Sequence, residues 1–391
     1  MRILFTTHPM SGHYHPLQPV ATAALRAGHE VAFATGTSCA DSVERSGFKF
    51  FAAGANPDEP DVEATVTQGE ALTGLDQMLF ALTQLFLGVL AERMAPDLER
   101  VVDDYRPDVM ISEITEFVGP MLAEKLGLPA VSLQFGVIHP REALIPVLGP
   151  RVRALRERLG LDNPEQVAGS LERALHLVFA TPSYQLPGVD LGENTFLYQP
   201  RVFDRSGDER LPAWFAELRE RPIVYGTLGT VPVFNARPGA LRSIIDALGA
   251  CDVHGVVTCG RNQDPAGFGP LPDNVRLERY IPQSLLLPHC SAVIGHGGYG
   301  TTMGSLCFGV PMVITPLGAD QPIHAARCSD LGLAEVIQPE QVTAKALASA
   351  LQRVLTTPSY TERAQAFQRE LTALPPVEEA IERVRAFAHG A

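Results

Sequence analysis

The chain has 391 residues, enough for two or three domains that each bury a core. Hydrophobic residues make up 46% and charged residues 19%, and 34 Gly and 32 Pro are spread along the chain, which excludes disordered and collagen-like proteins. With 31 Lys plus Arg against 44 Asp plus Glu, the net charge of -13 repels a phosphate backbone. We therefore expect no nucleic-acid partner.

Three features of the sequence bear on where the protein works. Only five residues separate Arg2 from His8, too few for the apolar core of a secretory signal. The longest apolar run, residues 78–91, is 14 residues long, short of the ~20 that span a membrane, and predicts a buried helix. The six cysteines form no C-x-x-C pair. We expect a cytoplasmic protein with reduced thiols, no membrane partner, no disulfide framework and no zinc.

Short apolar runs alternate along the chain with longer segments of helical periodicity. In chain order these runs are residues 3–7, 31–35, 109–112, 130–135, 223–227, 255–259, 292–294 and 312–315. Strands that alternate with helices form parallel sheets whose faces the helices cover. The sequence therefore predicts an α/β protein.

A weak internal repeat indicates two similar halves. Residues 108–131 and 291–314 both follow the order strand, loop, helix, Gly, apolar residue, Pro, strand. Between them, residues 198–222 lose apolar periodicity and gain charge and proline, which predicts a linker. We place the boundary near residue 210.

The prediction is thus an N-terminal domain at residues 1–210 and a C-terminal domain at 211–391, both Rossmann-like and doubly wound. The amphipathic pattern at residues 377–387 predicts a last helix that can pack on either domain. Ligands of such sheets bind outside the C-terminal strand ends. We expect the domains to face each other across a cleft that holds the chemistry.

Three histidines crowd the loop that follows the first strand. No carboxylate or cysteine accompanies His8, His13 and His15 locally, so a metal site is disfavoured. A histidine with a pKa near ~6.5 at a strand end can instead accept a proton from a hydroxyl. We interpret His8 and His15 as loop residues satisfied by backbone or water.

Two carboxylates follow the strand at residues 109–112. Glu113 and Glu116 lie at the same end of the first sheet as His13, where a carboxylate can orient a histidine base and balance its charge. The alternative is a solvated acid at a helix N-terminus, favoured by the helix dipole. We keep that alternative for Glu116.

A glycine-rich turn at residues 295–300 joins a short strand to a helix that we expect to begin near Thr301. Gly297, Gly298 and the free N–H groups of the first turn can approach an anion, and Thr301 and Thr302 add hydroxyl donors. His296 can add a ring N–H. A tight turn alone would need fewer glycines, so we favour a phosphate site.

The same turn also matches a dinucleotide fingerprint. Gly295, Gly297 and Gly300 spell G-x-G-x-x-G, and Asp320 follows 20 residues later. Asp320, however, lies in a loop beyond the next strand, with only 71 residues after it, and is placed to contact a ligand's hydroxyls. We treat NAD-dependent dehydrogenase chemistry as the least favoured alternative.

Five motifs occur in order: GHYHPL at 12–17, IVYGTLGT at 223–230, RYIPQSLLLPHC at 279–290, HGGYGTT at 296–302 and PLGADQPIHAAR at 316–327. Together they resemble nucleotide-sugar glycosyltransferases of the GT-B fold. More narrowly, the chain resembles bacterial transferases that attach deoxysugars to macrolides, enediynes and aromatic polyketides. The resemblance implies two Rossmann-like domains, an acceptor-binding one followed by a donor-binding one.

The resemblance also implies roles for individual residues. His13 corresponds to the general base, and Glu113 stands where relatives usually have an aspartate that partners it. The donor would be held by Gly229 and Thr230 at its phosphates, Ile281 and Gln283 at its base, His296, Gly297, Gly298, Thr301 and Thr302 at its diphosphate, and Asp320 and Gln321 at its sugar. The acceptor wall would include Phe80, Phe86 and Phe135.

One departure bears on the donor. Plant relatives have a ribose-binding glutamate eight residues after the phosphate-binding histidine, and Gly304 occupies that position here. A 2′-deoxyribose donor, hence a TDP-sugar, is therefore favoured over a UDP-sugar. We expect no other cofactor and no metal.

The predicted function is an inverting transfer of a sugar or deoxysugar from a TDP-sugar to a hydroxyl, or similar nucleophile, of a hydrophobic natural-product aglycone in antibiotic biosynthesis. The alternatives are a UDP-sugar-dependent transferase that inactivates a small molecule, a nucleotide-sugar epimerase of the same fold, and a non-catalytic binding protein. The sequence does not name the aglycone, the sugar or the atom glycosylated. It leaves open a homodimer and an activator protein.

Overall fold

The computed structural model describes residues 1–72, 74–138, 141–166, 169–202, 209–218, 220–230, 232–235, 237, 239–261 and 263–390. The chain divides into two compact units. Unit 1 comprises Met1–Gln199 and Leu374–Ala391, and unit 2 comprises Pro200–Ala373. The chain thus leaves the first unit at Gln199 and returns to it at Leu374.

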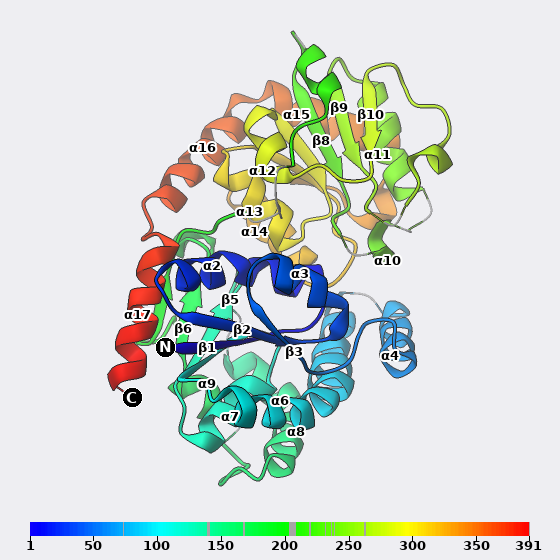
Figure 1. Cartoon of the computed structure of the whole chain (residues 1–391). Coiled ribbons are helices and arrows are strands. Elements are labelled where there is room, and N and C mark those ends of the chain that lie inside the picture. Colours follow the sequence, from blue (N-terminus) through cyan, green and yellow to red (C-terminus); the bar gives the residue numbers. More distant parts are fainter. Residues whose placement is uncertain are drawn as a thin grey trace. The chain divides into compact units, whose positions relative to one another are not determined.

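Unit 1 contains a seven-stranded parallel sheet (Figure 1). Its strand order is β3 (Lys49–Ala52), β2 (Glu30–Thr35), β1 (Arg2–Thr6), β4 (Val109–Glu113), β5 (Ala130–Gln134), β6 (Leu175–Val178) and β7 (Thr195–Leu197). Its helices are α1 (Ser11–Tyr14), α2 (Gln18–Arg26), α3 (Ala40–Arg45), α4 (Pro60–Glu70), α5 (Gly74–Phe80), a π-helical segment (Ala81–Leu90), α6 (Ala91–Tyr105), α7 (Val118–Leu126), α8 (Arg141–Arg158), α9 (Gly169–Arg173) and α17 (Val377–Gly390).

The central strands of unit 1 are apolar because helices cover both faces of the sheet. Helices α2 and α3 lie on one side, and α6 and α7 lie on the other (Figure 1). Ile3, Leu4 and Phe5 of β1 are fully buried, as is Ile111 of β4. Helix α7 ends at Leu126, and the φ of 65° of the following Gly127 provides the left-handed turn that returns the chain to β5.

The long apolar helical stretch of unit 1 departs from the predicted buried helix. Only Leu87, Gly88, Leu90 and Ala91 of residues 78–91 are buried, and the rest are half-buried. The π-helical segment has wide turns and a kink at Gly88 (φ -95°, ψ -113°), which turn its side chains away from a single core-facing stripe. Gly74–Tyr105 is also the one described helix whose length and composition could cross a membrane.

Unit 2 contains a six-stranded parallel sheet. Its order is β10 (Val275–Glu278), β9 (His254–Thr258), β8 (Ile223–Thr227), β11 (Ala292–Gly295), β12 (Met312–Ile314) and β13 (Ala334–Val336). Its helices are α10 (Pro232–Asn235), α11 (Ala240–Gly249), α12 (Gln283–Leu286), α13 (Tyr299–Cys307), α14 (Gln321–Asp330), α15 (Ala344–Thr356) and α16 (Pro358–Thr372). Short 3₁₀ turns in the chain lie at His15–Leu17, Thr37–Cys39, Pro182–Tyr184, Ala213–Glu217, Pro265–Phe268, Leu287–His289 and Pro339–Gln341.

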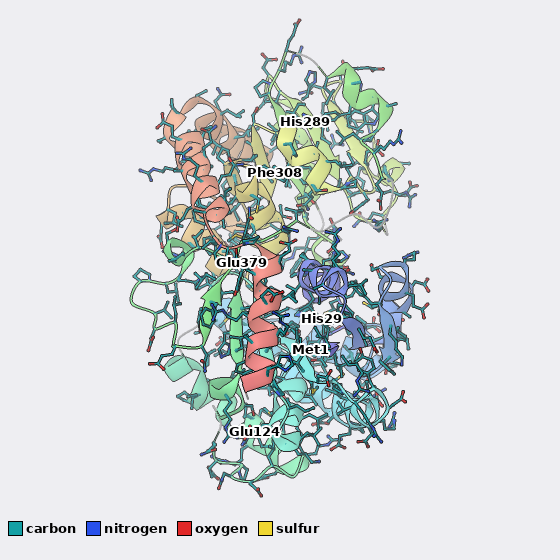
Figure 2. All side chains as sticks on the ribbon, turned by 60° about the vertical axis from the view of Figure 1, so that its left-hand side comes forward. Met1, His29, Glu124, His289, Phe308 and Glu379 are labelled. Atoms are coloured by element: carbon teal, nitrogen blue, oxygen red, sulfur yellow. The ribbon has the colours of Figure 1, made fainter. Side chains whose placement is uncertain are left out.

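The C-terminal helix α17 belongs to unit 1, where it packs on α2 and β6. The guanidinium of Arg383 lies 3.7 Å from the ring centre of Phe196 on β7. Nearby, the N-terminal ammonium of Met1 lies 3.4 Å from His29 Nδ1, and Figure 2 shows both residues beside the helix. The last helix therefore ties the two ends of the chain to one unit.

The doubly wound α/β fold predicted from the sequence is confirmed. All eight predicted strands are present to within one residue at each end, and the last helix begins at the predicted residue but ends three residues later than predicted, at Gly390. Five strands were not predicted: β3, β6, β7, β10 and β13. Each is three or four residues long; four of the five are edge strands, and β6 lies next to one, where weak apolar patterning suffices.

Candidate functional site

Both sheets reverse their strand order at one point, between β1 and β4 in unit 1 and between β8 and β11 in unit 2. Crevices at such switch points, outside the carboxyl ends of the strands, are where ligands of doubly wound sheets bind. The predicted catalytic residues follow β1 and end β4, and the predicted donor-binding loops follow β8 and β11. Each unit is described in turn.

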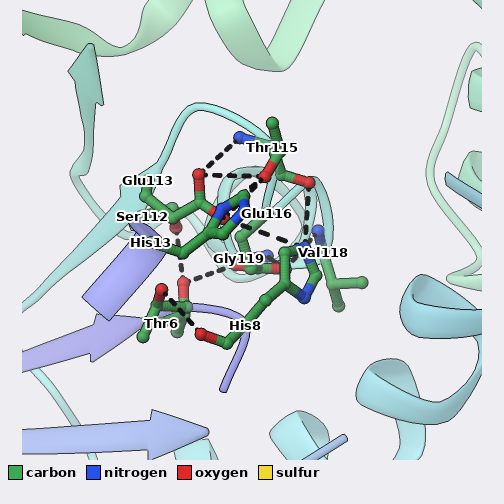
Figure 3. Close-up of polar contacts among 10 residues, drawn as sticks. Thr6, His8, His13, Ser112, Glu113, Thr115, Glu116, Val118 and Gly119 are labelled. Carbon is green, nitrogen blue, oxygen red and sulfur yellow. Dashed lines mark hydrogen bonds and ion pairs between the residues drawn. The ribbon is translucent and has the colours of Figure 1, made fainter. Parts of the chain in front are cut away.

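His13 and Glu113 lie in contact in unit 1 (Figure 3). His13 is on the short helix α1 and Glu113 is the last residue of β4, and Nδ1 of the histidine is 3.0 Å from Oε1 of the glutamate. The sequence did not predict a third member, Thr115. Its hydroxyl donates to Glu113 Oε1 at 2.7 Å and lies 3.1 Å from His13 Nδ1, and its backbone N–H donates to Glu113 Oε2 at 2.8 Å.

This arrangement keeps the Glu113 carboxylate charged although it is buried. Burial alone would raise the pKa of Glu113. The pKa is nevertheless lowered to about 2, because His13 faces and hydrogen-bonds the carboxylate, with smaller contributions from His8 and the Thr115 N–H. A carboxylate at Nδ1 stabilises the tautomer with its proton on Nδ1, in which the lone pair is on Nε2. The His13 side chain is 22% exposed, so solvent reaches the ring.

His8 is buried beneath the pair, and its interpretation as a loop residue bonded to the backbone is confirmed. Its Nε2 lies 3.1 Å from the carbonyl oxygen of Thr115 and 3.8 Å from Glu113 Oε1. Burial lowers the pKa of His8 to about 4, against the opposing effect of Glu113. His8 is therefore neutral at pH 7.

The interpretation of Glu116 as a solvated acid is wrong. Its residue is 1% exposed, although its carboxylate does lie at the N-terminus of α7, where Oε1 accepts from Val118 N at 2.7 Å and Oε2 accepts from Gly119 N at 3.0 Å. Oε2 also accepts from the hydroxyl of Thr6 (Figure 3). The sequence could not reveal this, because Thr6 comes from a distant strand.

Of the three predicted acceptor-wall phenylalanines, Phe86 lies beside His13 and His8. Its ring centre is 5.3 Å from that of His13 and 5.2 Å from that of His8. Phe80, at the end of α5, faces Gly69 of α4. Phe135 is half-buried directly after β5, whose Leu133 pairs with Glu113 in the sheet.

In unit 2, His296 lies between two glycines. It follows β11, and a Cβ placed on Gly229 or on Gly298 would come within 2.6 Å of its ring. Gly297 has φ +88°, and a Cβ there would lie 2.8 Å from Ile314. Gly298 is the N-cap of α13, which begins at Tyr299, two residues earlier than predicted, because Gly298 adopts the extended conformation of a cap.

Several polar atoms in this region lack a partner among the described residues. They are His296 Nδ1, Thr302 Oγ1 and Thr315 Oγ1, in residues that are 7%, 1% and 3% exposed. Burial lowers the pKa of His296 to about 4, so its ring is neutral and carries one N–H. Buried polar atoms without partners are rare, and a bound anion is one explanation for a cluster of them beside a helix N-terminus.

Other predicted donor-binding residues are held by hydrogen bonds within unit 2. Thr301 Oγ1 accepts from Gln283 Nε2 at 3.2 Å, which links the start of α12 to α13. Gly229 donates from its N–H to Thr227 Oγ1 at 3.1 Å, and its carbonyl oxygen accepts from Asn235 at 2.9 Å. Ile281 is buried and Thr230 is exposed.

The two predicted sugar-binding residues differ in environment. Asp320 has a side chain that is 53% exposed, and its Oδ2 lies 3.1 Å from Nε2 of His324, one turn along α14. Gln321 is 1% exposed, and its Oε1 accepts from the N–H groups of Leu317 at 2.6 Å and Gly318 at 3.2 Å. The contact between Asp320 and His324 was not predicted.

No group of three or more His, Cys, Asp or Glu side chains among the described residues is arranged to hold a metal ion. The polar atoms of His8, His13 and Glu113 instead contact one another and Thr115.

Comparisons with known proteins extend this description. Residues 23–200 and 242–387 match the N-terminal and C-terminal domain models of erythromycin biosynthesis protein CIII-like proteins. The 4'-demethylrebeccamycin synthase of Lentzea aerocolonigenes is 30% identical, over 97% of this chain and 98% of that protein. The aclacinomycin-T 2-deoxy-L-fucose transferase of Streptomyces galilaeus is 28% identical, over 96% and 93%.

Solved structures are similar over the whole chain. CalG4, the calicheamicin glycosyltransferase, has a TM-score of 0.82 at 25% identity and covers 99% of this chain and 98% of its own. Glycosyltransferase VinC, in complex with DTDP, has a TM-score of 0.76 at 26% identity, with 100% of both chains covered. The fold and these similarities define a glycosyltransferase of the GT-B fold. Within that class, the chain belongs to the erythromycin biosynthesis protein CIII-like family.

The burial of Glu116 predicts how the stability of unit 1 depends on pH. Burial raises the pKa of Glu116 to about 7 from an ordinary value of 4.5. A folded-state pKa above the unfolded one contributes stability that is present below pH 4.5 and is lost as the pH rises through 7. For Glu116 the loss is about 3 kcal/mol.

We therefore expect Glu116→Gln to remove this loss. Chemical unfolding at pH 5 and at pH 8 should show the free energy of unfolding of the wild type falling by about 3 kcal/mol more than that of the variant. The pKa of Glu113 is lowered, so its protonation changes the free energy of unfolding only below about pH 4.5. That contribution is the same in both proteins. Parallel pH profiles for the two proteins would contradict the raised pKa of Glu116.

Proposed function

We propose that this glycosyltransferase inverts the anomeric carbon as it moves a deoxysugar from a TDP-sugar to a hydroxyl of a hydrophobic natural-product aglycone in antibiotic biosynthesis. The observation that carries the proposal is the contact between His13 Nδ1 and Glu113 Oε1 at the switch point of the first sheet. It supplies a general base where a doubly wound sheet binds its ligand.

His13 is the base in the proposed reaction. As the acceptor oxygen attacks the anomeric carbon, Nε2 takes its proton, and the ring becomes an imidazolium that Glu113 stabilises through Nδ1. The bond between the anomeric carbon and the diphosphate oxygen breaks in the same displacement, and the single displacement inverts that carbon. Thr115 supports the step because it holds the carboxylate in place.

The leaving diphosphate is bound in unit 2. The N–H groups at the start of α13, the neutral ring of His296 and the hydroxyl of Thr302 provide donors for its developing charge. Gly229 and Gly298 keep both sides of the ring clear, and Thr230 follows Gly229 at the surface. The chain supplies these donors itself, and the proposed reaction uses no metal.

The TDP preference is supported by the surroundings of Gly304. A Cβ at this position would meet Gln283 and Leu287, so the position lies beside the loop proposed to hold the nucleotide base and offers no carboxylate for a 2′-hydroxyl. Solved relatives with thymidine diphosphate, VinC and SsfS6, accord with this choice.

The sugar and the acceptor are assigned to different units. Asp320, with an exposed carboxylate, is the group proposed to bond sugar hydroxyls, and Gln321 holds the loop before it. Phe86 forms the apolar wall beside His13, with Phe80 and Phe135 as further candidates. Unit 1 is thus the acceptor domain and unit 2 the donor domain, and the enzyme is proposed to act in the cytoplasm.

The base assignment predicts a selective loss of turnover. His13→Ala should lower kcat roughly 10²- to 10⁴-fold, which is the usual contribution of a general base, while the Kd for TDP stays within a factor of about two. Steady-state rates and calorimetry measure the two effects. The matched control is His15→Ala, two residues along the same segment, and comparable losses in both variants would remove His13 from the role of base.

The assignment of Thr302 to the diphosphate site predicts a loss of nucleotide binding. Thr302→Ala should weaken TDP binding roughly 10-fold or more, because a hydrogen bond to a charged group contributes about 1.5–3 kcal/mol. The free protein should stay folded, since this hydroxyl has no partner among the described residues. Thr356→Ala removes a hydroxyl of the same unit that bonds only within its helix, and serves as the control. Equal TDP affinity in both variants would exclude Thr302.

The first measurement is a calorimetric titration with TDP, UDP and NAD without added metal. We expect TDP to bind more tightly than UDP, and NAD not to bind. Tighter UDP binding would favour the alternative of a UDP-sugar-dependent transferase, and NAD binding alone would indicate a dehydrogenase. An epimerase would convert the nucleotide sugar with no acceptor present.

A further inference from the structure

Glu116 lies in the turn that follows β4, three residues after Glu113, and nothing in the proposed reaction uses it. Its residue is 1% exposed, and both carboxylate oxygens accept hydrogen bonds. Oε1 accepts from Val118 N and Gly119 N at 2.7 and 3.2 Å, and Oε2 accepts from Gly119 N at 3.0 Å and from the hydroxyl of Thr6. A buried carboxylate with this many donors is a fixed point in the structure.

One of these donors comes from the end of β1, and the other two come from the start of α7. Thr6 ends β1, seven residues before His13, and its hydroxyl also lies 2.7 Å from that of Ser112. Thr6 and Ser112 are partners in the parallel register of β1 and β4, and Glu113 follows Ser112. Figure 3 shows the carboxylate of Glu116 near these two hydroxyls, under the loop that holds Glu113 and Thr115.

The loop itself is short and closed by Glu116. The N–H of Glu116 donates to the carbonyl oxygen of Glu113 at 3.0 Å, so residues 113–116 form one tight turn. The position of the Glu116 carboxylate therefore limits where the turn can move. Thr115, inside the turn, bonds Glu113 and lies 3.1 Å from His13.

Gly119 closes the space on the other side. A Cβ at Gly119 would come within 2.6 Å of both Glu116 Oε2 and Thr6 Oγ1, so the carboxylate packs against the bare backbone of α7. Only glycine leaves room for this approach. The carboxylate cannot shift toward α7 without a clash. Its hydrogen bonds to the Thr6 hydroxyl and to the N–H groups of Val118 and Gly119 oppose movement in other directions.

We propose that Glu116 is a positioning residue, which joins the end of β1 to the start of α7 and thereby fixes the turn that presents Glu113 to His13. The proposal rests on the proposed role of His13 as base and adds a second carboxyl that acts through the first. Glu116 is 1% exposed and acts in this proposal only through Glu113, so it is not a catalytic residue. Its raised pKa, caused first by burial and in part by Glu113, accords with a carboxyl close to the charged pair.

The experiment compares Glu116→Ala, Glu116→Gln and Thr6→Val, each with and without Glu113→Gln, in the full chain. Gln keeps the shape of the side chain and an accepting oxygen, whereas Ala removes all side-chain hydrogen bonds of Glu116. Thr6→Val removes only the hydroxyl donor from β1. The measured quantities are kcat, KM for the acceptor and for the nucleotide sugar, Kd for TDP and thermal unfolding.

We expect Glu116→Ala to lower kcat roughly 10- to 100-fold, with both KM values and the Kd for TDP nearly unchanged, because displacement of the pair affects the chemical step. Thr6→Val should lower kcat in the same direction by a smaller factor, and Glu116→Gln should retain most of it. In the Glu113→Gln background, Glu116→Ala should change kcat less than twofold, since the group through which Glu116 acts is already altered.

A control separates positioning from loss of a helix cap. Thr343 accepts a hydrogen bond from Ala346 N at the start of α15 in unit 2, so Thr343→Ala also weakens a helix start. It should lower thermal stability without lowering kcat. If Glu116→Ala does not fold, Thr6→Val and its double variant carry the test alone.

The outcomes distinguish the proposals. Unchanged kcat in Glu116→Ala, or an equal loss in the Glu113→Gln background, overturns the positioning role of Glu116 while leaving His13 as base. If instead His13→Ala retains wild-type kcat, the proposed role of His13 as base is overturned, and the positioning role of Glu116, which rests on it, is overturned with it.

Discussion

Parallel pairing at the two switch points is the constraint on which the rest of the structure depends. His13 and Glu113 are 100 residues apart in sequence, and the register of β1 with β4 brings Thr6 opposite Ser112, one residue before Glu113. In unit 2, the pairing of Gly295 with Thr227 likewise brings His296 beside Gly229. Because parallel strands end at the same edge, each register brings the polar loops of two distant segments to one place.

Environment separates the two buried carboxyls at the end of β4. Glu113 faces His13 and the donors of Thr115, and its pKa falls to about 2, whereas Glu116 has no cationic partner among the described residues, and its pKa rises to about 7. Both residues are glutamates and both are buried to nearly the same extent, so the difference between their pKa values comes from the groups that face each carboxyl. Carboxyls three positions apart on one chain can thus serve different purposes, as two carboxyls in one active site often do.

The sequence predicted those features that are carried by residue type and local spacing. The central strands, His13, Glu113 and the glycine-rich turn have strong local patterns. The structure places Glu113 at the end of β4, His13 in the segment after β1 and the turn directly after β11. Short strands such as β7 and β13 have weak patterns, because three residues give little periodicity. The burial of Glu116 and the role of Thr115 depend on Thr6 and His13, which reach them only through the fold.

The hydrogen bonding of the two regions differs in a way that fits their proposed tasks. The atoms around Glu113 bond one another, since Thr115, His13 and His8 all approach the same turn, and such a saturated network holds a base in one orientation. In unit 2, buried atoms of His296, Thr302 and Thr315 have no partner among the described residues. Buried donors left unpaired raise the free energy of the unliganded protein, and a ligand that bonds them recovers that energy on binding. The proposed base is therefore held in one orientation, whereas the proposed diphosphate site keeps unpaired polar atoms for a ligand. Both arrangements follow from loops at the ends of parallel strands.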